Sequence, residues 1–173
     1  QARGLGLRLD GGLVKETAMA VAKQLQKYLD QQGIDYDLVQ HPRTECTSET
    51  AQAAHIPGTK VLKTVVIHRE QGCVLAVVPS THRIRLDALQ DILGAPLGLA
   101  SETEIAELFD DCELGAMPPI GAAYDLPVML DQGLAELDDV YFEAGDHTTL
   151  VHVNGAEFKT LMHDARNDRF SSH

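Results

Sequence analysis

One lysine stands in a largely apolar run, residues 61–67, which reads Val-Leu-Lys-Thr-Val-Val-Ile. If this run is a strand, alternation places Lys63 on the same face as Val61, Val65 and Ile67. Lysine is seldom buried without a partner, because burial disfavours its charged form. Such an amine suits a ligand phosphate or a developing oxyanion. The alternative is an edge lysine whose tip reaches water.

A glycine-proline loop from Gly115 to Gly121 is the second candidate. Its two glycines and two prolines make a stiff backbone that can present free N–H groups to a ligand. Backbone N–H groups can stabilise a carbonyl oxygen as it becomes negatively charged. An ordinary connecting turn is the alternative interpretation.

The turn over residues 143–147, Glu-Ala-Gly-Asp-His, is the third candidate. Gly145 permits a tight turn or the close approach of a ligand. His147 could bind or orient a substrate near neutral pH. The alternative is a turn histidine that faces solvent.

Metal and cofactor chemistry have little support in the sequence. The eight histidines are scattered, and the offset of five between His147 and His152 would place them on opposite faces of a strand. Cys46, Cys73 and Cys112 lack a CxxC spacing, so they are expected to be reduced, buried thiols rather than a zinc site or disulfides. No nucleophile elbow, Walker loop or dinucleotide fingerprint occurs. We therefore predict no metal and no cofactor.

The composition limits the class of protein. The chain has 173 residues, the size of one domain, and its 44% hydrophobic content is typical of a soluble fold. A net charge of -12 weighs against DNA binding and against tight, sequence-independent RNA binding, but allows a small footprint on one RNA end. No long apolar run and no secretory signal occurs, so we expect a cytoplasmic protein without a membrane partner.

The elements that must position these residues follow from periodicity and capping signals. We expect a single compact α+β domain over residues 14–163, with a mixed sheet and helices packed around it. A loose arm is expected over 1–13 and a frayed polar tail over 164–173. Helices are predicted over 14–32, from Thr47 or Ser48 to 54, from Asp87 to 93, from Ser101 to 109 and from Asn154 to 162. Strands are predicted over 34–38, 61–69, 73–79, 128–130, 140–143 and 150–153.

Taken together, these stretches resemble the YbaK/ProRS-associated editing domain family. The resemblance covers roughly residues 28–162, and the order of the motifs is what makes it specific. In chain order the motifs are His41-Pro42, Thr47 and Ala51, the run 61–66, Pro79, the Gly115–Gly121 loop and Gly145.

The resemblance implies a curved mixed sheet and hydrolysis of mischarged aminoacyl-tRNA. Members act as an inserted domain of prolyl-tRNA synthetase or as freestanding proteins. The family's functional lysine falls on Lys63, and the loop that holds the aminoacyl end falls on residues 115–118. A late histidine that shapes the amino-acid pocket in one branch falls on His147. The YbaK branch carries an acidic residue in the last strand where this chain has Leu150, which argues against specificity for Cys-tRNA(Pro).

The predicted function is therefore a freestanding trans-editing hydrolase that cleaves the ester of a tRNA mischarged with Ala, Ser, Thr or Cys. The predicted partners are the 3′ end of an aminoacyl-tRNA and an aminoacyl-tRNA synthetase. The predicted catalytic residues are Lys63 and Gly115, and the predicted substrate-binding residues are Thr47, Ala116, Met117, Pro118, Gly145 and His147.

No protein general base is evident, so a ribose hydroxyl of the substrate could assist the attacking water. The main alternative is a non-catalytic regulatory or aminoacyl-binding module of the same fold within a larger signalling protein. A small-molecule ester hydrolase and a purely structural domain are further alternatives.

Overall fold

The protein is described by a computed structural model, which covers residues 6–7, 21–44 and 46–173. Apart from residues 6–7, the predicted arm over 1–13 lies outside these ranges, as does the first predicted helix before residue 21. Within them, no helix is long and apolar enough to cross a membrane. The described helices are α1 (Lys23–Gln31), α2 (Thr47–Ala53), α3 (Leu86–Leu93), α4 (Glu102–Leu108) and α5 (Gly155–Leu161), with 3-10 turns at Gly58–Lys60, Gly121–Tyr124 and Gln132–Leu134.

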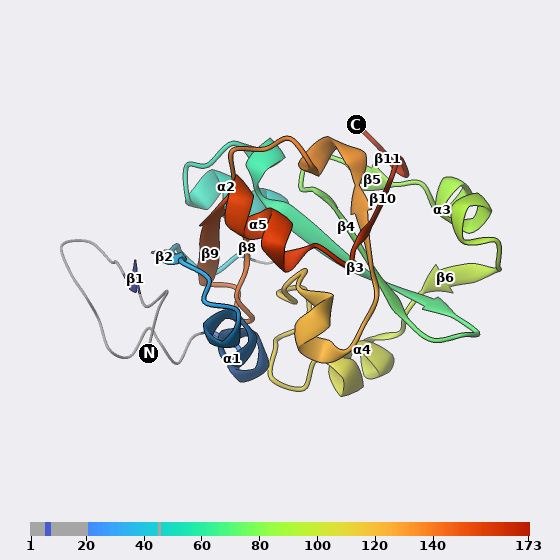
Figure 1. The fold of residues 1–173 in the computed structure, drawn as a ribbon, viewed down its shortest axis with the longest axis horizontal. Coiled ribbons are helices and arrows are strands. Elements are labelled where there is room, and N and C mark those ends of the chain that lie inside the picture. Colours follow the sequence, from blue (N-terminus) through green and yellow to red (C-terminus); the bar gives the residue numbers. More distant parts are fainter. Residues whose placement is uncertain (1–5, 8–20, 45) are drawn as a thin grey trace.

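Two mixed sheets form the centre of the fold (Figure 1). The first has the strand order β1-β2-β9-β8 and the second β10-β7-β4-β3-β6, while β11 and β5 form a small ladder. The two sheets meet where Val61 bridges Tyr141 in a parallel sense. The strands are β1 (Gly6–Leu7), β2 (Asp37–Gln40), β3 (Leu62–Arg69), β4 (Val74–Pro79), β5 (Arg83–Ile84), β6 (Leu97–Leu99), β7 (Val128–Asp131), β8 (Asp139–Glu143), β9 (Thr149–Asn154), β10 (Arg166–Asp168) and β11 (Ser171–Ser172).

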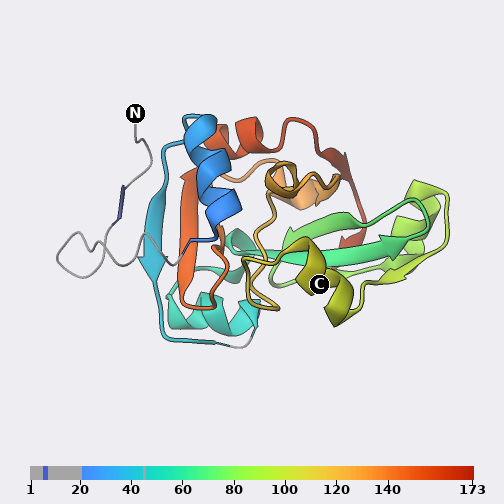
Figure 2. The ribbon, with the colours of Figure 1, turned by 90° about the horizontal axis from the view of Figure 1, so that it is seen from below.

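Helices cover both faces of the first sheet. Helices α1 and α5 lie on one side of β8 and β9, and α2 lies on the other (Figure 2). The side chains of β8 alternate accordingly, because Val140 and Phe142 join the core beneath α1 and α5 while Tyr141 packs toward α2. The predicted α+β fold with a mixed sheet is confirmed.

The hairpin predicted from residues 61–79 is present as β3 and β4, which pair antiparallel. Gly72 closes the turn with φ +118, a backbone conformation that side chains rarely adopt. Every residue of β4 is buried, since β4 is an inner strand between β3 and β7. In this register Lys63 lies opposite Val78.

The sequence located several helix ends correctly. The Ser101 hydroxyl accepts the Glu104 N–H at 3.1 Å, and the Asn154 side chain accepts the Glu157 N–H at 2.8 Å. Gly94 ends α3 in the left-handed conformation, with φ +69. These contacts satisfy backbone groups that a helix end leaves unpaired.

Two predicted caps are wrong. The N-cap of α2 is Cys46 rather than Thr47 or Ser48, and the N-cap of α3 is Arg85 rather than Asp87. Thr47 and Asp87 lie inside the first turn of their helices. The side chains of Cys46 and Arg85 make no capping hydrogen bond. The preference for Ser, Thr, Asp or Asn at the N-cap therefore could not locate the start of these two helices.

The predicted frayed tail over 164–173 is also wrong. Strand β10 pairs in parallel with β7, and β11 pairs antiparallel with β5. Phe170 between them is fully buried, its N–H donates to Asp131 at 3.3 Å and its carbonyl accepts the Arg85 N–H at 2.7 Å. One buried aromatic ring therefore anchors a segment that is polar elsewhere.

Candidate functional site

Lys63 lies between two apolar clusters on one face of β3. Val61 packs into the cluster beneath α2, whereas Val65 and Ile67 pack toward α3 and Phe170. The predicted alternation of this run is therefore confirmed. Lys63 itself is half-buried, and its Nζ donates to the backbone carbonyl of His82 at 2.7 Å.

The environment of Lys63 favours binding of an anion. Burial lowers the pKa of the Lys63 amine, and the positive charge of Arg83 lowers it further, while Cys46 acts in the opposite direction. A negative ligand group beside Nζ would offset both lowering effects. An ammonium group has three donors, so Lys63 can bind such a ligand without releasing the His82 carbonyl.

The C-terminal strand supports the turn that holds Lys63. The His82 N–H donates to the Pro79 carbonyl at 3.0 Å, and its ring Nδ1 hydrogen-bonds the Ser171 hydroxyl at 2.9 Å. The same ring contacts the ring of His173, with centroids 4.6 Å apart. The segment that the sequence predicted to be frayed thus fixes the backbone acceptor of the candidate lysine.

The structure brings His147 and the glycine-proline loop together. His147 is buried and its Nε2 donates to the Leu114 carbonyl at 2.6 Å. The Glu113 N–H donates to the Gly145 carbonyl at 2.8 Å. His147 holds φ +64, which is costly for a residue other than glycine and is common at functional sites.

Two backbone N–H groups of the Gly115–Gly121 loop already have local hydrogen-bond partners. Ala116, Met117 and Pro118 are buried, whereas Gly115 is exposed and has φ +86. The Gly115 N–H points at the Met117 sulfur at 3.2 Å, and the Ala116 N–H donates to the Glu113 carbonyl at 3.0 Å. Because proline has no N–H, Met117 supplies the remaining N–H between residues 115 and 119.

Gly145 makes room for Ala22, the residue that precedes α1, and for Cys112. A Cβ at this position would lie 3.2 Å from the Ala22 Cβ and 3.5 Å from the Cys112 sulfur. Its φ of +123 also restricts the position to glycine. Gly145 therefore shapes the turn that carries His147, and direct contact with substrate stays a prediction.

Glu143 is a functional candidate that sequence reasoning missed. It is 3% exposed, and its Oε2 accepts the Thr50 hydroxyl at 3.2 Å. Its Oε1 is buried and has no hydrogen-bond partner among the described residues. Burial raises the pKa of Glu143 to about 7, the Asp146 charge acts in the same direction, and the Thr50 hydrogen bond opposes them.

The signal for Glu143 was present in the sequence. It ends a strand of otherwise apolar or aromatic residues after Asp139, much as Lys63 interrupts its own run. In the β8–β9 register Glu143 lies opposite Leu150. Directly paired residues share a face of the sheet. The acid is therefore on β8, directly beside Leu150 of β9.

Residues 41–50 connect these groups. The His41 N–H donates to the Thr148 carbonyl at 2.9 Å, and the Thr44 N–H reaches the His147 carbonyl at 3.4 Å. The Thr50 hydroxyl pairs with the Thr44 hydroxyl and with the Cys46 carbonyl. Thr47, a predicted substrate-binding residue, is buried at the start of α2.

One segment thus contacts the Glu143–His147 turn. The Arg43–Glu113 ion pair, at 2.6 Å, ties the same segment to the residues before Gly115. This segment therefore links the Glu143–His147 turn to the residues before Gly115, whereas Lys63 is held separately by the His82 carbonyl.

Comparison with known proteins supports a shared fold and family. The family profile described as the aminoacyl-tRNA editing domain matches residues 41–161. Proline--tRNA ligase of Bacillus cereus is 26% identical over 109 residues, which are 62% of this chain and 19% of the ligase. A proline--tRNA ligase of Bacillus thuringiensis is 27% identical over the same length. The chain thus spans about a fifth of the length of these relatives.

Solved structures show the same architecture. A candidate trans-editing enzyme for prolyl tRNA synthetase aligns with a TM-score of 0.76 and 27% identity, over 88% of this chain and 97% of that one. A protein from Marinobacter aquaeolei, described as a candidate signal transduction protein, aligns with a TM-score of 0.71 and 19% identity, over 87% of this chain and 30% of that one. The second likeness concerns the fold alone.

Proposed function

The chain belongs to the aminoacyl-tRNA editing domain family, and from this premise we propose that it hydrolyses the ester of a tRNA mischarged with a small amino acid. The amino acid would be Ala, Ser, Thr or Cys. The observation that carries the proposal is the half-buried Lys63 amine. Its pKa is lowered by burial, and an anionic ligand beside it would raise the pKa again. The family match spans Lys63, Glu143 and His147.

Lys63 would hold the terminal phosphate or ribose of the tRNA. Its amine keeps two donors beyond the one used by the His82 carbonyl. A phosphate accepts charge-assisted hydrogen bonds and would favour the charged form of the amine. With a net charge of -12, the chain needs such a local cation to receive an RNA end.

The loop after Leu114 would stabilise the carbonyl oxygen during attack. The Ala116 N–H already donates to a carbonyl, so we assign the oxyanion contact to the Met117 N–H, with the Gly115 N–H as a second donor. The Gly115 contact to sulfur is weak enough for a substrate oxygen to replace it. His147 would fix the loop through the Leu114 carbonyl and limit the size of the amino acid.

Glu143 would receive the α-ammonium group of the amino acid. Its unpaired Oε1 lacks the partner that a buried carboxylate requires, and an ammonium group would supply one. A water molecule would attack the ester, with a ribose hydroxyl of the substrate assisting. Editing of this kind serves a synthetase pocket that cannot reject a smaller amino acid by binding alone. Prolyl-tRNA synthetase is the proposed partner, in keeping with the relatives above.

The proposal is tested by the release of amino acids from a panel of charged tRNAs. The panel contains tRNA(Pro) charged with Ala, Ser, Thr, Cys or Pro, together with cognate Ala-, Ser- and Thr-tRNA. Release of one small amino acid, with Pro-tRNA(Pro) left intact, is the expected result. If the folded protein releases none of them but binds charged tRNA, the non-catalytic binding module replaces the hydrolase.

A further inference from the structure

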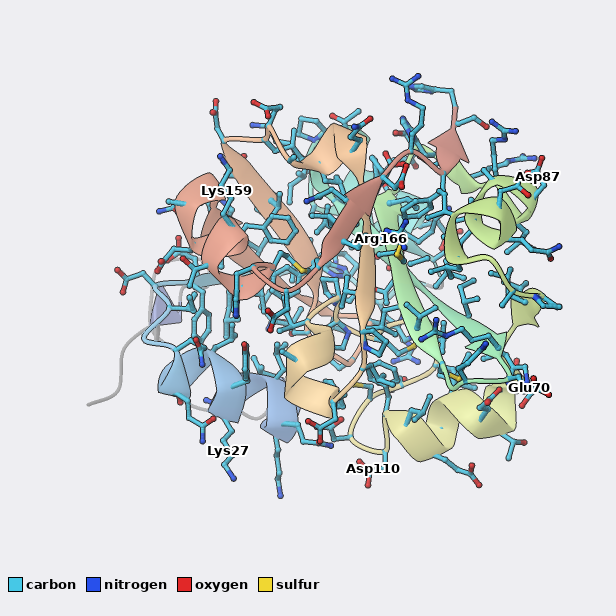
Figure 3. The ribbon with its side chains drawn as sticks, turned by 45° about the vertical axis from the view of Figure 1, so that its right-hand side comes forward. Lys27, Glu70, Asp87, Asp110, Lys159 and Arg166 are labelled. Carbon is cyan, nitrogen blue, oxygen red and sulfur yellow. The ribbon has the colours of Figure 1, made fainter. Side chains whose placement is uncertain are left out.

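Three potential metal ligands converge at the closed end of the β3–β4 hairpin, and none belongs to the site above. His68 lies near the end of β3, Cys73 directly precedes β4, and Glu104 lies on α4. His68 Nδ1 is 2.9 Å from Glu104 Oε2, and Cys73 Sγ is 3.3 Å from the same oxygen. One ligand atom from each residue lies within 4.8 Å of the other two. Figure 3 shows this turn, marked by Glu70, beside α4.

The separations suit a small cation. Zinc binds sulfur at about 2.3 Å and nitrogen or oxygen at about 2.0–2.2 Å, so tetrahedral ligand atoms stand roughly 3.3–3.6 Å apart. The Cys73 Sγ–Glu104 Oε2 separation of 3.3 Å already lies in that range, and the His68 Nδ1–Glu104 Oε2 separation of 2.9 Å needs only a small side-chain rotation to reach it. Imidazole, thiolate and carboxylate are all ligand types of zinc.

Two of the three side chains, Cys73 and Glu104, are held in place by the surrounding structure. Cys73 is 9% exposed, and the Ser101 cap orders the first turn of α4, where Glu104 lies. The His68 side chain is 57% exposed, which leaves an approach from solvent. Three elements separated in sequence therefore deliver one ligand each to an accessible point.

We propose that His68 Nδ1, Cys73 Sγ and a Glu104 carboxylate oxygen bind one divalent transition-metal ion, preferentially Zn²⁺, with water in the fourth position. On binding, Cys73 releases its thiol proton to solvent and a metal–sulfur bond forms. The ion would join α4 to the hairpin. Helix α4 leads into residues 109–114, which directly precede the Gly115–Gly121 loop of the candidate site.

Without an ion the same groups form hydrogen bonds. Burial raises the pKa of Cys73 to about 11, and Glu104 adds to this effect through a hydrogen bond and its charge, while Arg69 opposes it. The thiol therefore keeps its proton until a cation is present. Metal binding is expected to release that proton, as thiolate coordination requires.

Cobalt titration of the full chain tests the proposal, because Co²⁺ bound to a thiolate gives a near-ultraviolet charge-transfer band. The wild-type protein is expected to show the band with one Co²⁺ per chain, and Zn²⁺ is expected to abolish it by competition. Cys73→Ser should remove the band. Glu104→Gln should weaken Co²⁺ binding by at least ~10-fold, because loss of a direct ligand should cost no less than loss of an outer-shell partner does.

Two further variants keep the result interpretable. Cys46→Ser removes the exposed thiol and should leave the band unchanged. His68→Ala removes an exposed ring, so the variant should fold normally. Its affinity for Co²⁺ should nevertheless be at least ~10-fold lower than that of the wild type. A wild-type protein without the band, or a band that survives Cys73→Ser, overturns the site. The readout is metal binding, so it is independent of deacylation and of the proposed function.

Discussion

Replacing Glu143 by glutamine should stabilise the protein in a strongly pH-dependent way. The pKa of Glu143 is raised from 4.5 to about 7, chiefly by burial. Each pKa unit corresponds to about 1.4 kcal/mol, so ionising Glu143 in the folded state costs about 3 kcal/mol. Between pH 4.5 and about 7 the folded chain holds a proton that the unfolded chain releases. Stability therefore falls as pH rises through this window, and the full cost is present above it.

The assay is urea denaturation of the wild type and Glu143→Gln at pH 5 and pH 8. Glutamine cannot ionise, so the stability of the variant relative to wild type should be higher at pH 8 than at pH 5 by about 2 to 3 kcal/mol. Glu136→Gln, at an exposed position, provides the matched control and should show no such difference. An effect of Glu143→Gln that is the same at both pH values would refute the assignment of a buried, ionisable carboxylate.

Three related predictions concern activity and packing. Glu143→Gln should lower the kcat/KM of deacylation, because glutamine has no negative charge to receive the α-ammonium group, even though the variant is more stable. Unchanged kinetics would remove Glu143 from the site. His147→Asn keeps a residue that tolerates φ +64 but cannot reach the Leu114 carbonyl, so kcat/KM should fall by about 10-fold or more, and an unchanged value would count against the loop assignment. Phe170→Ala should cost about 3–5 kcal/mol of unfolding free energy by denaturation, whereas a loss below ~1 kcal/mol would mean that the tail is not anchored.

Local signals in the sequence predicted much of the fold. The Ser101 and Asn154 caps, the left-handed Gly94 and the β3–β4 hairpin all depend on neighbouring residues, and each is present. The position of Lys63 also followed from local alternation, because a strand fixes which side chains share a face. These are the features for which a short window of sequence contains the physical cause.

Features that depend on distant residues were not predictable in the same way. The burial that raises the pKa of Glu143 arises from tertiary packing, and its one described hydrogen-bond partner, Thr50, lies 93 residues away in sequence, so the raised pKa has no local signal. Phe170 is the one large apolar side chain in residues 164–173, and its burial depends on the β10–β7 and β11–β5 pairing. The ligand cluster around Cys73 likewise requires α4 to meet the hairpin, which no spacing of cysteines and histidines could indicate.

The most direct test of the proposed function is single-turnover deacylation of the mischarged tRNA that the panel identifies, using wild type, Lys63→Ala and Lys27→Ala. Lys27 projects from the exposed side of α1, so its variant removes one positive charge away from the candidate site (Figure 3). Lys63→Ala should lower the rate by at least ~10²-fold, the usual scale for one electrostatic contact in a catalytic site, while Lys27→Ala stays within about 2-fold of wild type. A folded Lys63→Ala variant that deacylates at the wild-type rate would contradict the central role of Lys63.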